Sequence, residues 1–557
     1  MTVHDILMWR NQGNRMMTSG MPGGPIAERL GGSGPSPLEF RPRTVIVASI
    51  LAAAVIATAG SLSDVCLSDE NHHVRQVQAY AQAGRRVSYD PAFALDDLVP
   101  SAFSCTPLWH AGLAVLWRLA GTKLQTLAQV YQASFYLLLL LSVYFGTRRI
   151  WGPSAASWAW LFIASMPMVC VYSMLLYQDV PGIAVSALGF LLLFRGNFLG
   201  AGLCFAAAYL TKMNMLSYAP WAVAVAGWRA EGTLKRRLVA AALVAVPVAV
   251  ALGYDTGWRL TNYGIAIGAP PPDFRGLSAS ALAAITTLPA NYVAWQRYPV
   301  WNPEAFVMKV GVPVTFGIFL LLFVKWDAAS KWIWICLGCA LGAYVFVFVV
   351  AMGFPYGWSN IRYLLPVVFV LALLCGEAFA KWRPWSWLKV VLVLGCLVQG
   401  LLACGYTYCV RRVSEADIAA CAWIRENTPE KARIMCPEQD ITNQTGRPVI
   451  WLELNPAYFM TQASDQQRLE VLRCFRVFHI VIPRCDIYDR DKEGDHHGGY
   501  PRDFVEKAHT LPYLEKVYEN DGFLIFKFNP HLTFNPSLKI PLAESHPRVA
   551  LTKTEGG

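Results

Sequence analysis

The apolar positions of this chain gather in long, nearly uninterrupted runs, which is typical of helices surrounded by lipid and unlike the alternating pattern of soluble strands. The first run, 44–63, contains no charged residue and has about the 20 residues that a membrane-spanning helix needs. Further runs lie at 126–147, 153–178, 180–194, 198–211, 214–228, 238–254, 310–324, 332–353, 363–380 and 390–409. The pattern predicts an all-α polytopic transmembrane bundle of about 11 helices.

Polar stretches divide the rest of the chain. Residues 1–43 are rich in Gly, Pro, Ser and Arg, which predicts a disordered tail. The bundle then occupies 44–409, and its two longest connections predict large loops at 64–125 and 255–309. We expect a separate domain from 410 to 557, where the long apolar runs end.

This C-terminal region has the pattern of a small α/β domain. Residues 414–427 predict a helix, and the apolar stretches 432–436 and 477–483 predict short buried strands. Residues 517–528 predict a hairpin around the turn Asn520-Asp521-Gly522. The region contains no GxGxxG or P-loop motif, so nothing in it indicates nucleotide binding.

Composition agrees with a membrane protein. Hydrophobic residues make up 55% of the chain and charged residues 15%, whereas globular domains carry about 25% charged residues. The formal net charge is +10, but the part from Arg411 onward holds 19 Lys and Arg against 21 Asp and Glu. The basic excess therefore lies between the apolar runs, which indicates membrane orientation and not a nucleic-acid partner.

The basic loops predict which way the bundle faces. With the N-terminus in the cytoplasm, the inner loops contain eleven basic residues, namely Arg148, Arg149, Arg195, Arg229, Lys235, Arg236, Arg237, Lys325, Lys331, Lys381 and Arg383. Only Glu231 and Asp327 oppose them, as the positive-inside rule requires. Both large loops and the C-terminal domain are then extracytoplasmic. We expect a multi-pass protein, in the cytoplasmic membrane of a bacterium.

Two adjacent carboxylates follow the first apolar run. Asp69 and Glu70 lie at the expected water boundary, where a carboxylate can take a proton from an acceptor hydroxyl. The same residues also suit the start of a helix that continues through Gln78, with Asp69 or Asn71 as its cap. Chemistry alone leaves both interpretations open.

Other polar residues lie at the outer ends of apolar runs. Asp179 occupies a turn between two runs, and Lys212 lies between the short runs 198–211 and 214–228, which predict a bent pair with the lysine at its elbow. Arg362-Tyr363 begins a run on the outer side, and Arg259 lies in the second large loop. These residues are candidates for binding an anionic lipid headgroup, although capping and snorkelling account for them as well.

Four stretches in order along roughly 60–400 resemble the motifs of the GT-C class of membrane glycosyltransferases. They are Asp69-Glu70, Leu176-Tyr177-Gln178-Asp179-Val180-Pro181, the stretch from Gly202-Leu203-Cys204-Phe205 to Leu210-Thr211-Lys212, and Arg362-Tyr363-Leu364-Leu365-Pro366. The spacing Asp69, Glu70, His73, Gln76 and Tyr80 is similar to the dolichyl-phosphate-glucose α-1,2-glucosyltransferases. The C-terminal domain instead resembles the bacterial protein-mannosyl and aminoarabinose-transferase type.

The resemblance implies an inverting glycosyltransferase that moves a sugar from a polyprenyl-phosphate donor to an acceptor hydroxyl at the extracytoplasmic face. It implies catalytic roles for Asp69, Glu70 and Asp179. Residues that contact the donor phosphate would be Lys212, Arg362 and Arg259, and residues that bind substrate would be His73, Gln76 and Tyr363. Some members use a divalent metal near the acidic pair.

One rival interpretation is a transporter or flippase that moves a lipid-linked sugar without chemistry. Transporters commonly contain internal repeats and charges near the bilayer midplane. The chain has no convincing repeat, and its notable charges lie at outer helix ends. The sequence leaves the sugar and the acceptor, whether lipid, glycan or protein, undetermined.

Overall fold

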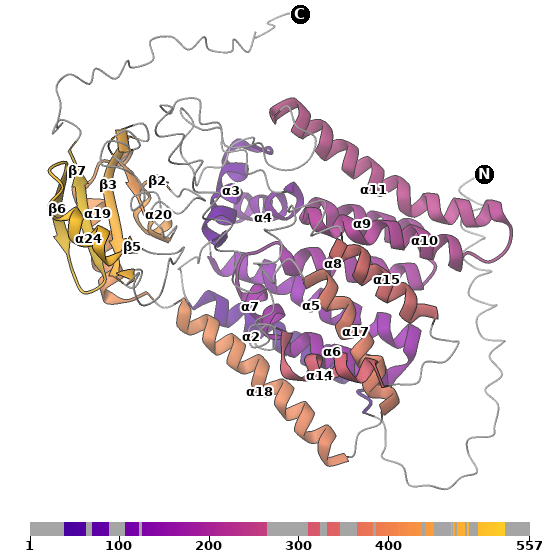
Figure 1. Ribbon diagram of the computed structural model, residues 1–557. Coiled ribbons are helices and arrows are strands. Elements are labelled where there is room, and N and C mark those ends of the chain that lie inside the picture. The colour runs from indigo at the N-terminus through magenta and orange to yellow at the C-terminus, as the bar shows by residue number, and fades with distance from the viewer. Residues whose placement is uncertain are drawn as a thin grey trace, which may run out of the picture.

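The protein is a helical bundle with a small mixed sheet at one end (Figure 1). The computed structural model describes residues 38–62, 69–87, 106–121, 125–263, 310–323, 331–345, 365–382, 386–411, 413–436, 440–450, 469, 472–473, 476–484, 487–488 and 500–529. The expected disordered tail, 1–43, lies mostly outside these residues.

The bundle is built from long and broken helices. They are α2 (Pro42–Ser61), α5 (Gln125–Trp151), α6 (Pro153–Ser165), α7 (Pro167–Met174), α8 (Asp179–Phe194), α9 (Phe198–Thr211), the 3₁₀ helix η2 (Met213–Tyr218), α10 (Ala219–Arg229), α11 (Leu234–Tyr263), α14 (Val312–Leu321), α15 (Lys331–Val345), α17 (Leu365–Trp382) and α18 (Ser386–Val410).

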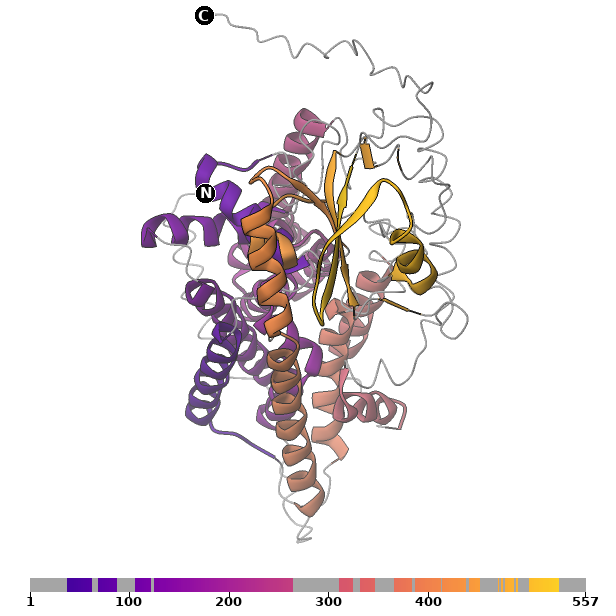
Figure 2. The same ribbon diagram turned by 90° about the vertical axis from the view of Figure 1, so that its left-hand side faces the viewer.

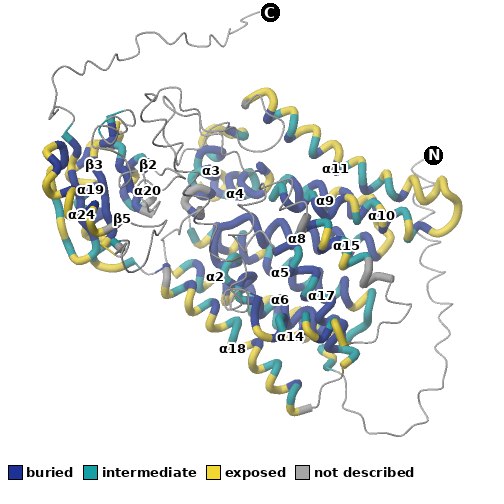
Figure 3. The backbone as a smooth tube through the Cα atoms, in the orientation of Figure 1, coloured by how far each residue is buried: buried dark blue, intermediate teal, exposed yellow. Residues whose placement is uncertain are grey.

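Several of these helices are long and apolar enough to cross a membrane. Within the described residues α2, α5, α11, α17 and α18 qualify by length and composition, and the bent pair α6–α7 qualifies when its two helices are taken together. Figure 3 shows α11 and α18 exposed along much of their length, while α5 and α8 are buried. The exposed face of α18 carries Leu401 and Leu402, which are 64% and 68% accessible. Such an apolar outer surface fits a lipid environment, because soluble proteins rarely expose large apolar patches.

At the break between α6 and α7, a side chain from another helix forms a hydrogen bond with a backbone carbonyl. The two helices bend by 54° at Pro167, which has no backbone N–H to donate. The amide of Gln399 on α18 donates to the carbonyl of Ser165 at 2.9 Å, and its oxygen accepts from Val312 N–H at 3.1 Å. This matters because unmet backbone groups are costly in a bilayer.

The apolar runs 198–211 and 214–228 form a bent pair, as the sequence predicts. Helix α9 ends at Thr211, Lys212 is extended with φ −150° and ψ 124°, and η2 begins at Met213. Lys212 is therefore the elbow residue of the pair.

The two large loops differ from expectation. Region 64–125 contains two helices, α3 (Asp69–Ala83) and α4 (Pro107–Ala120). The expected start of the second loop at 255 is wrong, because α11 continues to Tyr263. Asp255 and Arg259 form an ion pair four residues apart, which stabilises this last polar part of the helix. Residues 264–309 lie outside the described part.

The C-terminal region contains helices and a small mixed sheet. A five-stranded sheet has the order β2-β1-β3-β7-β6 and a small second sheet pairs β4 with β5. The elements are α19 (Glu415–Asn427), β1 (Arg433–Met435), α20 (Asp440–Thr445), β2 (Val449–Ile450), β3 (Val477–Pro483), β4 (Ile487–Tyr488), β5 (Tyr500–Pro501), α24 (Arg502–Ala508), β6 (Leu514–Glu519) and β7 (Phe523–Phe528).

Strands β1, β2 and β3 are parallel, and β7 is antiparallel to both β3 and β6. The expected hairpin is confirmed, since Asn520 Oδ1 accepts the backbone N–H groups of Gly522 and Phe523 at its turn. Figure 2 shows the sheet between α19 and α24. Alternation along β7 explains this, because Phe523 and Ile525 pack with α19 while Phe526 contacts His509 after α24.

Candidate active site

Five of the candidate residues, Glu70, His73, Gln76, Asp179 and Lys212, lie at the end of the bundle that faces the sheet (Figure 1). Helices α8 and α9 follow each other and pack side by side, so the start of α8 and the end of α9 lie at the same end. Gly182 lets them approach there. A Cβ atom at this position would lie 3.3 Å from Lys212 Cβ and 3.0 Å from Met215 Cγ. The glycine thus brings Lys212 beside the first turn of α8, which carries Asp179.

Asp179 and Lys212 form an ion pair at this point. The ammonium of Lys212 donates to Asp179 Oδ1, and the two side chains are 15% and 2% accessible respectively. Oδ2 of Asp179 is buried without a hydrogen-bond partner. The pair therefore presents a positive group held by one carboxylate oxygen, with the second oxygen still able to accept a hydrogen bond.

Glu70 is held differently. Its side chain is completely buried, and Oε1 accepts from Arg411 at 2.9 Å and from the backbone N–H of Leu176 at 2.8 Å. The carboxylate thus neutralises a buried arginine and binds the turn before α8. A general base must reach the proton it removes, and this enclosure disfavours Glu70 in that role.

A chain of polar side chains links α3 to the Asp179 turn. His73 Nδ1 lies 3.1 Å from His110 Nε2, and His110 Nδ1 lies 3.1 Å from Gln178 Nε2. Gln178 also donates to the carbonyl of Thr106, whose hydroxyl donates to the carbonyl of Thr211 next to Lys212. The network therefore connects α3, α4, α8 and α9.

Buried amides without partners lie on two elements of this region. Gln76 on α3 is fully buried, and neither atom of its amide has a hydrogen-bond partner. Asn214 on η2 is 6% accessible, and both of its amide atoms and the hydroxyl of nearby Ser217 are likewise unpartnered. Positions 214 and 217 share one face of a 3₁₀ helix. Such groups are rare in folded proteins unless a ligand or water satisfies them.

Arg259 belongs to a separate buried cluster. Its Nε donates to Asp255 Oδ2 at 2.9 Å, and the hydroxyl of Tyr209 donates to the same oxygen at 2.9 Å. Arg86, which follows α3, lies 2.8 Å from Asp255 Oδ1 and stacks on Trp258. The structure thus pairs Arg259 with a carboxylate inside a helix and does not place it in a loop, which weakens its expected role at the donor phosphate.

Three expected residues cannot be placed. Asp69 is the first residue of α3, but its side chain lies outside the described part, and so do Arg362 and Tyr363. The chain after them is anchored beside η2, because the hydroxyl of Tyr218 donates to the carbonyl of Pro366 at 2.7 Å. The role of these three residues stays a prediction.

A divalent metal near the acidic pair also stays a prediction. Among the described residues no three His, Cys, Asp or Glu side chains are grouped as a metal site. The carboxylate of Glu70 is bound to a guanidinium, which does not fit a metal ligand. We therefore derive no chemical step from a metal.

His110 and Arg411 were missed by the sequence reasoning. His110 lies in an apolar stretch of the first large loop, and the resemblance offered no motif for it. Arg411 directly follows the last apolar run on the outer side, where a basic residue is unfavoured by the positive-inside rule. This departure from the positive-inside rule was the signal by which Arg411 could have been found from the sequence.

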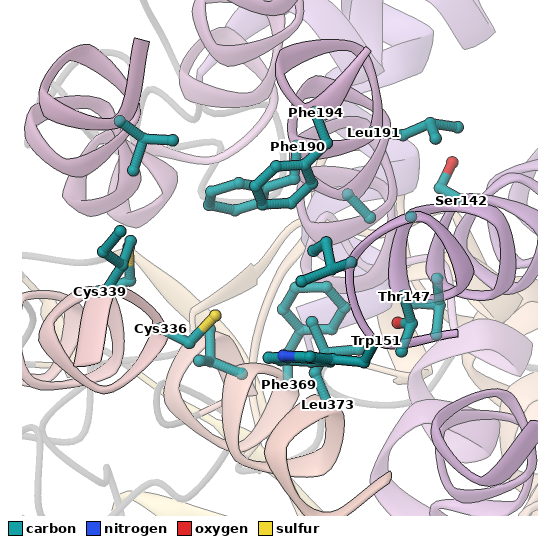
Figure 4. Close-up of a pocket in the computed structure, with 17 residues that line it drawn as sticks. Ser142, Thr147, Trp151, Phe190, Leu191, Phe194, Cys336, Cys339, Phe369 and Leu373 are labelled. Atoms are coloured by element: carbon teal, nitrogen blue, oxygen red, sulfur yellow. The ribbon is translucent and has the colours of Figure 1, made fainter. Parts of the chain in front are cut away.

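An apolar pocket among the described helices lies elsewhere (Figure 4). It has a volume of about 40 Å³ and is lined by residues of α5, α8, α10, α15 and α17, among them Phe190, Phe194 and Phe369. Phe190 is 11 residues along α8 from Asp179, a rise of about 16 Å. No candidate site residue lines this cavity, so it is not the candidate active site.

Solved structures align with this chain, whereas comparisons of its sequence find no relative. No family model and no curated protein matches the sequence. The structure of ArnT from Cupriavidus metallidurans bound to undecaprenyl phosphate aligns with a TM-score of 0.51 at 13% identity, over 86% of this chain and 97% of that chain.

Two other solved structures align to a similar degree. One is the Archaeoglobus fulgidus oligosaccharyltransferase tethered with an acceptor peptide, with a TM-score of 0.52 at 12% identity, over 87% of this chain and 74% of that chain. The other is the mycobacterial arabinofuranosyltransferase AftD, with a TM-score of 0.51 at 14% identity, over 89% of this chain and 42% of that chain. The chain therefore has the fold of the GT-C membrane glycosyltransferases.

Proposed function

We propose that the protein is an inverting glycosyltransferase that moves a sugar from a polyprenyl-phosphate donor to an acceptor hydroxyl. The observation that carries this proposal is the Asp179–Lys212 pair. It sets a partly buried cation, together with an unpartnered carboxylate oxygen, at a break in the bundle. The similar ArnT structure contains undecaprenyl phosphate, which supports a lipid-phosphate donor.

The proposed reaction needs a base and a stabilised leaving group. Asp69 removes the proton from the acceptor hydroxyl, and the oxygen then attacks the anomeric carbon from the face opposite the phosphate. The bond between that carbon and the phosphate oxygen breaks, and its electron pair leaves with the lipid phosphate. Lys212 stabilises the negative charge that develops on this phosphate. Asp69 is preferred to Glu70 because Glu70 is enclosed with Arg411.

The remaining polar groups suit recognition of the sugar. The unpartnered amides of Gln76 and Asn214 are able both to donate and to accept hydrogen bonds, as hydroxyl groups of a sugar require. Asp179 fixes Lys212, and the contact between His73 and His110 holds α3 against α4. Both amides are neutral, and Lys212 is assigned to the phosphate, so a neutral sugar suits these amides better than a charged one.

The reaction can be tested with purified protein in detergent. It would be incubated with polyprenyl phosphates that carry glucose, mannose, galactose, arabinose or aminoarabinose, each with a panel of lipid, glycan and peptide acceptors. We expect one donor to release free polyprenyl phosphate and a product of inverted anomeric configuration. Asp69→Asn should lower the rate at least 100-fold, whereas Asn427→Ala, on the exposed part of α19, should not change it.

The result that contradicts the proposal is equally clear. Full activity of Asp69→Asn would remove the base. In liposomes, movement of the sugar lipid across the bilayer without release of polyprenyl phosphate would instead support the flippase. The sequence has no convincing repeat and the structural neighbours are glycosyltransferases, so we favour the enzyme.

We further propose that the site faces the extracytoplasmic side, with the N-terminus in the cytoplasm. The candidate residues and the C-terminal domain lie at one end of the bundle, and the basic loops at Arg148–Arg149 and Arg195 lie at the other ends of α5 and α8. Labelling of single cysteines by a membrane-impermeant maleimide in intact cells tests this. Label at position 426 but not at position 236 supports the orientation, and the reverse contradicts it.

A further inference from the structure

The junction between the bundle and the C-terminal domain is built around Arg411. This residue immediately follows α18, and α19 begins four positions later at Glu415. Its side chain is nevertheless completely buried. An arginine at a water boundary normally keeps its charged head in solvent, so its enclosure here requires compensating contacts.

Those contacts come from three different segments. Arg411 Nη1 donates to the carbonyls of Gly60 at 3.0 Å and Met174 at 3.1 Å, and Nη2 donates to Glu70 Oε1 at 2.9 Å. Gly60 and Met174 lie in the last turns of α2 and α7, where carbonyls have no partner in their own helix. The guanidinium therefore caps two helix ends and neutralises the acidic start of α3.

The same carboxylate also binds the turn that carries Asp179. The backbone N–H of Leu176 donates to Glu70 Oε1 at 2.8 Å, three positions before Asp179. Glu70 itself follows Asp69 directly. One buried ion pair thus fastens the segment that carries the proposed base, Asp69, and the segment that carries Asp179, which holds Lys212. It does so where the chain enters the C-terminal domain.

We propose that Arg411 is a positioning residue that, through Glu70, sets the separation of Asp69 and Asp179 and couples it to the position of the C-terminal domain. The inference deepens the proposed function, because it rests on Asp69 acting as the base and on Asp179 holding Lys212 at the donor phosphate. It assigns Glu70 to the same task, so that the acidic pair divides into one reacting residue and one anchoring residue.

Loss of the Arg411–Glu70 pair should change the rate of the reaction, whereas loss of a contact that only stabilises the fold should not. Removal of Arg411 takes from the buried Glu70 carboxylate the guanidinium that neutralises it, and it leaves two helix ends uncapped. The start of α3 and the turn before α8 then move independently. The rate of the chemical step should fall, whereas substrate affinity should change little, because Lys212 and Asn214 lie at the end of α9 and on η2, which the ion pair does not hold.

The test uses three variants of the full-length protein in detergent: Arg411→Gln, Glu70→Gln and the double variant. A matched control is Arg447→Gln, which removes another buried arginine, one that donates to the carbonyls of Arg425 and Thr428 inside the C-terminal domain. We measure kcat and KM with the active donor, and hydrogen–deuterium exchange of the peptides covering 69–80 and 174–180.

Each single variant at the pair should lower kcat about 10- to 100-fold and change KM less than threefold. The double variant, in which two neutral amides face each other, should be at least tenfold more active than the product of the single effects predicts. Both peptides should exchange hydrogen faster in Arg411→Gln than in the wild type, and at the wild-type rate in Arg447→Gln. The control variant Arg447→Gln should also keep kcat within twofold of the wild type.

Two results would overturn the proposal. Activity at background in both Glu70→Gln and the double variant would make Glu70 a reacting group. Unchanged exchange of both peptides in Arg411→Gln would remove the anchoring role. The exchange measurement needs no substrate, so a protein that transfers no sugar at all refutes the proposed function while the anchoring by Arg411 is still decided.

Discussion

Gly202 gives the sharpest prediction about how the bundle is packed. It lies on α9 against α11, and a Cβ atom added there would lie 2.5 Å from the carbonyl oxygen of Leu243 and 2.8 Å from Cα of Val244. Carbon–oxygen contacts are normally about 3.3 to 3.6 Å. Both opposing atoms belong to the backbone, so neither can rotate away. Gly202→Ala must therefore move the two helices apart by about 1 Å.

The magnitude follows from two opposing terms. Overpacking of this kind costs about 1 to 3 kcal/mol, while alanine favours a helix over glycine by about 1 kcal/mol. Gly395 on α18 isolates the second term, because a Cβ atom there meets nothing within 4 Å. We expect Gly202→Ala to be about 2 kcal/mol less stable than Gly395→Ala, since the propensity gain is common to both.

The assay is denaturant unfolding of each variant in the same detergent, followed by tryptophan fluorescence. Donor turnover should also fall in Gly202→Ala, because the helices that separate carry Tyr209 and Asp255, whose side chains are hydrogen-bonded. Equal free energies of unfolding for the two variants would show that α9 and α11 do not meet at Gly202.

Other predictions concern the site and the C-terminal domain. Lys212→Met leaves the buried carboxylate of Asp179 without its cation, so it should cost about 3 kcal/mol in the free energy of unfolding; adding Asp179→Asn should recover part of that stability but no turnover, and a recovery of turnover would contradict the phosphate role. His110→Phe keeps an aromatic ring but removes the polar contacts of the imidazole with His73, Gln178 and the carbonyl of Thr106, and we expect donor turnover to fall at least tenfold; wild-type turnover would show that the histidine only packs. Burial, followed by the charge of Lys527 across the strand, lowers the pKa of His479 from 6.5 to about 4. As the pH falls from 6.5 toward 4, His479 is protonated in the unfolded chain before it is protonated in the folded one. The free energy of unfolding is therefore highest above pH 6.5 and falls by about 2 kcal/mol toward pH 4, after allowance for solvent screening. Thermal unfolding of His479→Gln should depend less on pH over this range, and an unchanged dependence would refute the assignment.

The sequence by itself determined the class of the fold. Apolar runs of about 20 residues have few structures open to them in lipid, since their backbone groups must be satisfied within the helix. The strands of the C-terminal region were also predictable from the sequence, because the stretch 477–483 is apolar and Asn520-Asp521-Gly522 is a local turn signal. The elbow at Lys212 followed from the shortness of its two flanking runs.

Helix ends were less predictable from composition. The run 238–254 stops where polarity begins, yet α11 continues because Asp255 and Arg259 pair within it and Tyr209 and Arg86 contact the same carboxylate. Those partners come from distant parts of the chain. Hydropathy records only the polarity of a residue, and whether a polar residue ends a helix depends on what it meets.

The different roles of Asp69 and Glu70 within the candidate site were decided by tertiary structure alone. Asp69 and Glu70 are neighbours of the same charge, so the sequence gives no reason to separate their roles. The separation comes from Arg411, 341 positions after Glu70, which encloses one carboxylate at 2.9 Å. Long-range electrostatic pairing of this kind has no local signature, because it depends on which helix ends the bundle brings together.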